Sequence, residues 1–94
     1  MTDKTTVSLG KALDIMHVDN LKGRLITARD KHKHIVLIAD KIEKADTAGL
    51  QLIYSFIRSL AELDSDAGFS WQKPSTALLS SCNTLGMTKH LKLN

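Results

Sequence analysis

One segment of the sequence places an acid, a hydroxyl and small side chains where a chemical modification could act as a switch. Residues 46–50 read Asp-Thr-Ala-Gly-Leu, and they come a few positions after the apolar run 35–39. A buried strand is expected to end before this segment, and a long helix to begin in it. Thr47 would then lie at a helix N-terminus, where the helix dipole favours the negative charge of a phosphate. The simpler interpretation is that Asp46 or Thr47 only caps the helix.

The rest of the sequence contains no recognisable catalytic centre. It has no Ser/His/Asp constellation, phosphate-binding glycine-rich loop or convergent carboxylate pair, so we predict that the chain is not an enzyme. His32 and His34 form an H-x-H pair on one expected strand face, but no third metal ligand lies nearby in sequence. We therefore predict neither a metal site nor a cofactor. Cys82 is expected to be a small core residue rather than a reactive thiol.

Composition restricts the classes of function further. The 94 residues suffice for one domain, and 43% of them are hydrophobic, as in folded globular proteins. No apolar run approaches the roughly 20 residues that span a bilayer. The polar N-terminus lacks the apolar stretch of a signal peptide, and one cysteine allows no internal disulfide. We expect a cytoplasmic domain without membrane insertion.

The densest basic segment is residues 29–34. It contains no aromatic side chain for base stacking and is interrupted by Asp30, so direct binding to nucleic acid is not predicted. A solvated helix end that runs through a turn into a strand explains it more simply.

The strongest helix prediction covers residues 47–63, because its apolar and polar side chains occupy opposite arcs of a helical wheel. The apolar arc contains Leu50, Leu52, Ile53, Tyr54, Phe56, Ile57, Leu60, Ala61 and Leu63, and the polar arc contains Gln51, Ser55, Arg58, Ser59 and Glu62. So wide an apolar arc predicts packing on a sheet and against a neighbouring helix. Alternatively, the flank around Leu52 and Phe56 is exposed for a partner.

Strands and helices are predicted to alternate along the chain, which indicates a small α/β domain with a mixed sheet and helices packed on one face or both. Trp71 is expected to anchor the sheet edge. Before the helix at 47–63, we predict strands at 7–9 and 12–16 joined by a hairpin turn at Gly10 and Lys11, and a strand at 35–39 buried on both faces. Between them we predict a helix capped by Asp19 or Asn20, with Val18, Leu21, Leu25 and Ala28 on one face. After the helix at 47–63 we predict a loop at 64–68, a strand at 69–71, a helix with Pro74 in its first turn and Gly86 after its end, and a last amphipathic piece or strand at 87–93; the inner face of that helix is formed by Leu78, Ser81, Cys82 and Leu85.

These elements and residues resemble a STAS domain, the family that includes bacterial anti-sigma factor antagonists. The resemblance covers residues 7–93 of a single domain that spans 1–94. It rests on Val36-Leu37, on residues 42–50 (Ile-Glu-Lys-Ala-Asp-Thr-Ala-Gly-Leu), on residues 71–75 with 77–78, and on residues 85–87.

The resemblance implies a STAS-like fold and a non-enzymatic role in bacterial signal transduction and transcription regulation. In antagonists of this family a partner kinase phosphorylates the Ser or Thr after the Asp, a role that falls here on Thr47. The unphosphorylated form would bind a serine/threonine kinase-type anti-sigma factor, with a phosphatase as a further partner. The expected partner-binding residues are Asp46, Thr47, Ala48, Gly49, Gln51 and Ser55.

Two other functions fit the same resemblance. The chain has Ile38 where many members carry an acidic residue in the preceding strand, and Thr47 where Ser is commoner. Thr47 also fits STAS members that are constitutive subunits, such as the small cytoplasmic partner of a lipid-transport ABC ATPase. A third alternative is a STAS protein of a chemosensory kinase system. All three would use the surface around Thr47, so the sequence does not separate them.

Overall fold

The computed structural model describes residues 4–63 and 68–93, and it confirms the α/β class. The predicted helix at 47–63 has the expected bounds. The elements in order are β1 (Lys4–Ser8), β2 (Ala12–Leu13), α1 (Val18–Lys31), β3 (His34–Ile38), β4 (Lys44–Ala45), α2 (Thr47–Leu63), β5 (Gly68–Gln72) and α3 (Thr76–Thr84). Most of the predicted loop at 64–68 lies outside the described residues.

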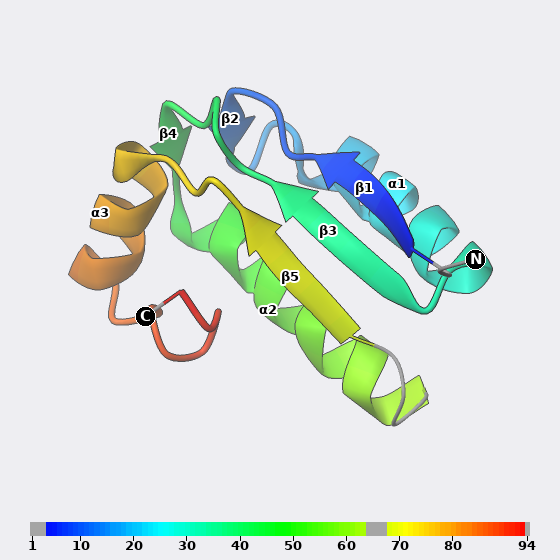
Figure 1. Cartoon of the computed structure of the whole chain (residues 1–94). Coiled ribbons are helices and arrows are strands. Elements are labelled where there is room, and N and C mark those ends of the chain that lie inside the picture. The colour runs from blue at the N-terminus through cyan, green and yellow to red at the C-terminus, as the bar shows by residue number, and fades with distance from the viewer. Residues whose placement is uncertain (1–3, 64–67, 94) are drawn as a thin grey trace.

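The described strands form two sheets in which every pairing is parallel (Figure 1). The larger sheet has the order β1-β3-β5, with β3 in the centre, and the smaller one pairs β2 with β4. The predicted mixed sheet is therefore wrong. The predicted hairpin at Gly10 and Lys11 is also wrong, because β1 and β2 belong to different sheets. Parallel strands need crossover connections, which α1 and α2 provide.

Helices α1 and α2 cover one face of the larger sheet (Figure 1). Ile35 and Leu37 point toward these helices and are fully buried in the core. Val36 and Ile38 alternate onto the opposite face, which no described helix covers. Val36 is still 5% exposed, flanked in register by Thr6 and Ser70, whereas Ile38 is half-buried. The strand is central as predicted, but helices bury it on one face only.

Helix α1 begins one residue before its predicted cap. His17 is the N-cap and Val18 starts the helix, so neither Asp19 nor Asn20 caps it. The predicted inner face is confirmed, because Leu21 and Leu25 are buried.

Helix α3, in contrast, begins later than predicted, with Ser75 as its N-cap and Pro74 just before it. Gly86 follows the helix in the left-handed conformation at φ 71°, as expected for a C′ glycine. Leu78 and Cys82 are fully buried, and burial raises the pKa of the Cys82 thiol, so this cysteine is a core residue. Leu85, expected on the inner face, is 43% exposed.

The flank of α2 around Leu52 and Phe56 lies against α1. Both side chains line a hollow of about 200 Å³ between the two helices, where Arg29 donates a hydrogen bond from Nη1 to Ser59 Oγ at 3.1 Å. Helix–helix packing therefore explains this flank. Ala61, assigned to the apolar arc, is exposed.

Trp71 anchors the edge of the sheet as predicted, since its Nε1 donates to the Leu91 carbonyl at 2.8 Å. This bond fastens the C-terminal segment, which forms turns rather than a strand. The basic segment 29–34 is a helix end leading into a strand, but His32 is the C-cap of α1 and only His34 lies in β3. The H-x-H pair therefore does not share one strand face. No helix in the described part of the chain is long and apolar enough to cross a membrane.

Candidate functional site

The segment before α2 is organised by Asp46. Its carboxylate accepts hydrogen bonds from the Gly49 amide at 3.0 Å and the Ile15 amide at 3.2 Å. Its backbone amide donates to the Leu13 carbonyl, and its carbonyl accepts the amide of Leu50. One acid therefore caps α2 and ties its start to the segment that follows β2.

Thr47 is the first residue of α2, and its side chain is exposed as predicted. Its hydroxyl forms no hydrogen bond to another residue in the described part of the chain. Because Asp46 supplies the cap, the Thr47 hydroxyl has no structural function within the domain. It is available to solvent at the positive end of the helix dipole.

Gly49 faces inward, away from the surface on which a partner would lie. A Cβ at this position would be 2.1 Å from the Leu13 carbonyl oxygen, so only glycine lets the first turn of α2 approach β2 this closely. Gly49 therefore positions the start of α2 against β2 and is not itself placed to contact a partner.

The other residues assigned to the partner surface lie on or near it. Gln51 and Ser55 are exposed, and Ala48 and Asp46 are half-buried. Gln51 is one helical turn from Thr47, whereas Ser55 is two turns away and lines the hollow between α1 and α2. Within the predicted set, Thr47, Gln51 and Ser55 are thus exposed along α2, whereas Gly49 is buried.

Asp14 is a second organising acid that the sequence analysis did not single out. Its carboxylate is 2.6 Å from His17 Nδ1 and 3.3 Å from Lys44 Nζ, and it accepts the Met16 amide at 3.2 Å. The hydrogen bond with His17 is the main cause that lowers the pKa of Asp14; Lys44 adds to this effect, and burial opposes it. Asp14 therefore braces the turn between β2 and α1, beside the amide held by Asp46.

Exposed apolar side chains border Thr47. The large hydrophobic residues with high exposure in the described structure follow β2, lie on α3 or directly follow it: Ile15 at 63%, Met16 at 82%, Leu79 at 38% and Leu85 at 43%. Ile15 and Met16 line a hollow of about 250 Å³ that shares Ala45 and Asp46 with the hollow beside Thr47. Leu85 lines the hollow beside Thr47 itself, and exposed apolar side chains in two adjoining hollows are typical of a protein-interaction surface.

The hollow beside Thr47 measures about 340 Å³ and is rich in hydroxyl groups. Its lining contains no histidine or lysine that could activate a hydroxyl as a nucleophile. These hydroxyl groups can form hydrogen bonds with a partner, and the carboxylate of Asp46, which also lines the hollow, accepts the Ile15 and Gly49 amides. The lining residues are Ala45, Asp46, Thr47, Ser80, Ser81, Thr84 and Leu85.

Two solved structures resemble this chain over nearly its whole length. The anti-sigma factor antagonist SpoIIAA, in its unphosphorylated form, has a TM-score of 0.73 and 16% identity over 95% of this chain and 77% of its own. The chain has the STAS fold. The NMR structure of the protein TM1081 has the same TM-score and 18% identity, and the match covers 98% of this chain and 74% of that one. No family model and no curated protein sequence matches. The predicted STAS resemblance is thus confirmed as a fold.

Proposed function

We propose that this STAS domain is a bacterial, non-enzymatic regulatory module similar to an anti-sigma factor antagonist, and that phosphorylation of Thr47 switches its binding to a kinase-type regulator. One observation carries the proposal: the Thr47 hydroxyl is exposed and free of hydrogen bonds to the described residues because Asp46 caps α2. A phosphoryl group can be added there without removing a bond that the fold needs.

The added charge would act on the complex rather than on the domain. A phosphoryl group brings about −1.5 to −2 charges, which the N-terminus of α2 tolerates. In a complex, the same charge would meet a partner surface that had fitted the bare hydroxyl and the apolar side chains of Ile15, Met16 and Leu85. Desolvation and repulsion there would weaken binding by about 1–3 kcal/mol, which is typical of regulatory coupling.

A constitutive subunit of a lipid-transport ABC ATPase is the second candidate. The observation that favours it is the exposure of Ile15 and Met16, at 63% and 82%, because permanently covered interfaces are more apolar than transient ones. A chemosensory STAS protein would use the same surface. In all three cases the partner is a protein that docks around Thr47 in the cytoplasm.

Affinity capture with matched baits separates these functions. The wild-type domain, Thr47→Glu and Thr76→Glu would be immobilised and exposed to native extract of the source organism. Thr76 is the matched control, since it is an exposed threonine at the first position of α3.

We expect a kinase-type regulator to be retained by wild type and Thr76→Glu but lost from Thr47→Glu. Incubation of the retained kinase with ATP should then place a phosphate on Thr47, located by mass spectrometry. A transport ATPase retained equally by all three baits would contradict the switch and support the constitutive subunit.

A further inference from the structure

Strand β1 has a free edge, and it belongs to a different sheet from β4, the strand that precedes Thr47. It is the outer strand of the β1-β3-β5 sheet, and no described strand lies on its other side. The Leu9 amide donates to the Ile38 carbonyl of β3, whereas the Ser8 carbonyl points outward and accepts from Arg24 Nη2 at 2.7 Å. Since backbone direction alternates along a strand, Thr6 also directs its N–H and C=O outward. The edge therefore offers the N–H and C=O of Thr6 to an added strand, while Arg24 already bonds to the Ser8 carbonyl.

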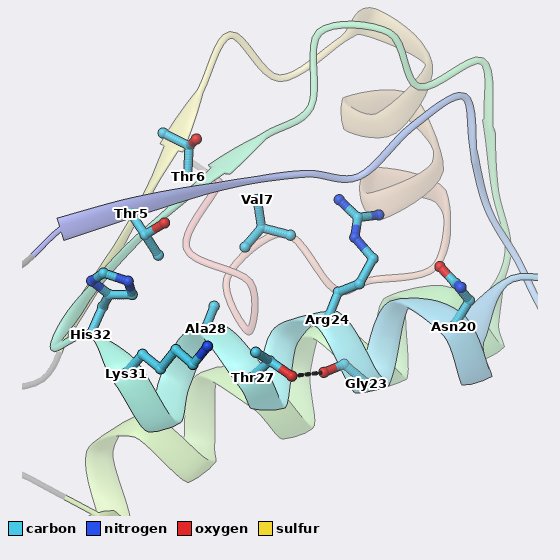
Figure 2. Close-up of a pocket in the computed structure, with 10 residues that line it drawn as sticks. All are labelled: Thr5, Thr6, Val7, Asn20, Gly23, Arg24, Thr27, Ala28, Lys31 and His32. Carbon is cyan, nitrogen blue, oxygen red and sulfur yellow. Dashed lines mark hydrogen bonds between the residues drawn. The ribbon is translucent and has the colours of Figure 1, made fainter.

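Helix α1 forms a shelf beneath this edge. Figure 2 shows the groove between them, about 580 Å³ in volume, with Arg24 rising from α1 toward β1. From Asn20 to Lys31 the helix advances about 16 Å, which equals the length of about five extended residues. β1 itself has five residues. A short extended segment beside β1 would thus lie over this stretch of α1 from end to end.

Gly23, in the middle of the shelf, keeps the groove open. Its φ is not positive, and a Cβ there would meet no atom within 4 Å, so neither backbone conformation nor packing inside the domain requires glycine. A glycine inside a helix lowers helix stability. The Thr27 hydroxyl also turns back onto its own helix, donating to the Gly23 carbonyl at 2.9 Å (Figure 2). Neither position 23 nor position 27 therefore projects a long side chain into the groove.

The charge of the groove selects its occupant. Lys31 provides positive charge toward one end of the groove and Arg24 provides it beside Gly23, and none of the ten lining residues is acidic. Pairing of β1 with β1 of a second copy would bring these cations and Lys4 together, so self-association is disfavoured. An acidic segment from another protein would instead complement them.

We propose that the groove between β1 and α1 binds a short, extended, acidic segment of a partner protein, which adds to the sheet as a strand beside β1. The groove shares no lining residue with the hollows around Thr47. It is therefore a second docking site, independent of the proposed switch, and it can hold a partner whether or not Thr47 is phosphorylated.

Amide NMR spectra of the 15N-labelled domain test the proposal with the synthetic peptide Ac-Glu-Val-Glu-Val-Glu-NH2 as probe and the Lys-for-Glu peptide as its control. We expect the acidic peptide to shift the amides of Thr6, Ser8, Gly23 and Thr27 and to slow hydrogen exchange at Thr6. The Lys-containing peptide should shift none of them.

Variants locate the binding. Gly23→Leu should fill the groove and abolish the shifts, while Gly23→Ala, which gains similar helix propensity with a small side chain, should still bind. Lys31→Glu should weaken binding by about threefold to tenfold, whereas Lys22→Glu, the same charge change elsewhere on α1, should have little effect.

The proposal is overturned if the acidic peptide produces no shifts at about 5 mM, a concentration that detects even millimolar affinity. Undiminished binding to Gly23→Leu, or equal weakening by Lys22→Glu, would also overturn it. Equal shifts with a short oligothymidylate would assign the groove to nucleic acid, and concentration-dependent dimerisation through the same amides would assign it to a second copy.

Discussion

Two helices of this domain begin beside a hydroxyl residue, and the two hydroxyls serve opposite purposes. At α3, Ser75 is the cap: its Oγ accepts the Leu78 amide at 3.1 Å and donates to the Ile42 carbonyl at 2.7 Å. At α2, Asp46 is the cap, and the Thr47 hydroxyl has no bond to a described residue. A hydroxyl at a helix start is thus available for modification only where a neighbouring residue has already satisfied the helix amides.

The same difference decides what a charge would do at each helix. A phosphate on Ser75, which is half-buried, would remove the hydrogen bond to the Ile42 carbonyl that joins α3 to the segment before β4, and it would disturb the cap on the Leu78 amide. A phosphate on Thr47 would remove none. Of these two residues, Thr47 is the one whose hydroxyl is free of bonds to the described residues, and the exposed Leu85 lines the hollow beside it.

The largest expected effect is at the glycine under the start of α2. Gly49→Ala places a Cβ 2.1 Å from the Leu13 carbonyl oxygen, so α2 must shift, and we expect a loss of about 2–4 kcal/mol in the free energy of unfolding. Urea denaturation measures it. Gly23→Ala is the control and should stabilise by up to about 1 kcal/mol. Equal midpoints for the two variants would refute the close packing of α2 on β2.

Removal of the Ser75 hydroxyl tests the structural half of the comparison. Ser75→Ala leaves the Leu78 amide and the Ile42 carbonyl without their partner, and we expect it to lower the free energy of unfolding by about 1–2 kcal/mol. Thermal and urea unfolding should agree on the size of the loss. If Ser75→Ala were as stable as wild type, the hydroxyl at α3 would be no more structural than the one at α2.

Acidification tests the acid beside the site. The pKa of Asp14 is held below its ordinary value of 3.8, so ionised Asp14 stabilises the fold above that pH, and this contribution is lost as pH falls through the lowered pKa. Asp14→Asn should therefore have a lower Tm than wild type at neutral pH. The Tm difference should shrink as pH falls below 3.8. A constant difference at all pH values would assign the effect to packing.

The smallest expected effect is at Thr47 itself. Thr47→Ala and Thr47→Glu should each change the free energy of unfolding by no more than about 0.5 kcal/mol, because no bond is lost and a carboxylate suits the helix N-terminus. Urea unfolding measures the change, with the Ser75→Ala variant measured under the same conditions for comparison. A large loss in Thr47→Ala would show that the threonine is structural after all.

Helix α2 and its start were predictable from the sequence, because amphipathic periodicity and the Asp-Thr-x-Gly segment are local signals. Which residue of that segment caps the helix was not predictable, since both Asp46 and Thr47 have side chains that can act as a cap. Only the approach of α2 to Leu13 shows that the acid is engaged and that Gly49 faces inward.

The larger errors concern contacts between distant parts of the chain. Gly10 has a positive φ of 75° and Lys11 forms a bend, so the chain does change direction there, but β2 pairs with β4 rather than returning to β1. No local pattern distinguishes these outcomes. Ile15 and Met16 were assigned to a strand for their apolar character, although the hydrogen bonds of Asp14 and Asp46 hold them in an exposed turn.

The most direct test of the Thr47 switch is calorimetric titration of the captured regulator with wild-type domain, Thr47→Ala, Thr47→Glu and Thr76→Glu. We predict that Thr47→Ala and Thr76→Glu bind like wild type and that Thr47→Glu binds at least about tenfold more weakly, a change of about 1.4 kcal/mol. Binding of Thr47→Glu as tight as wild type would contradict the switch and leave the constitutive subunit as the better account.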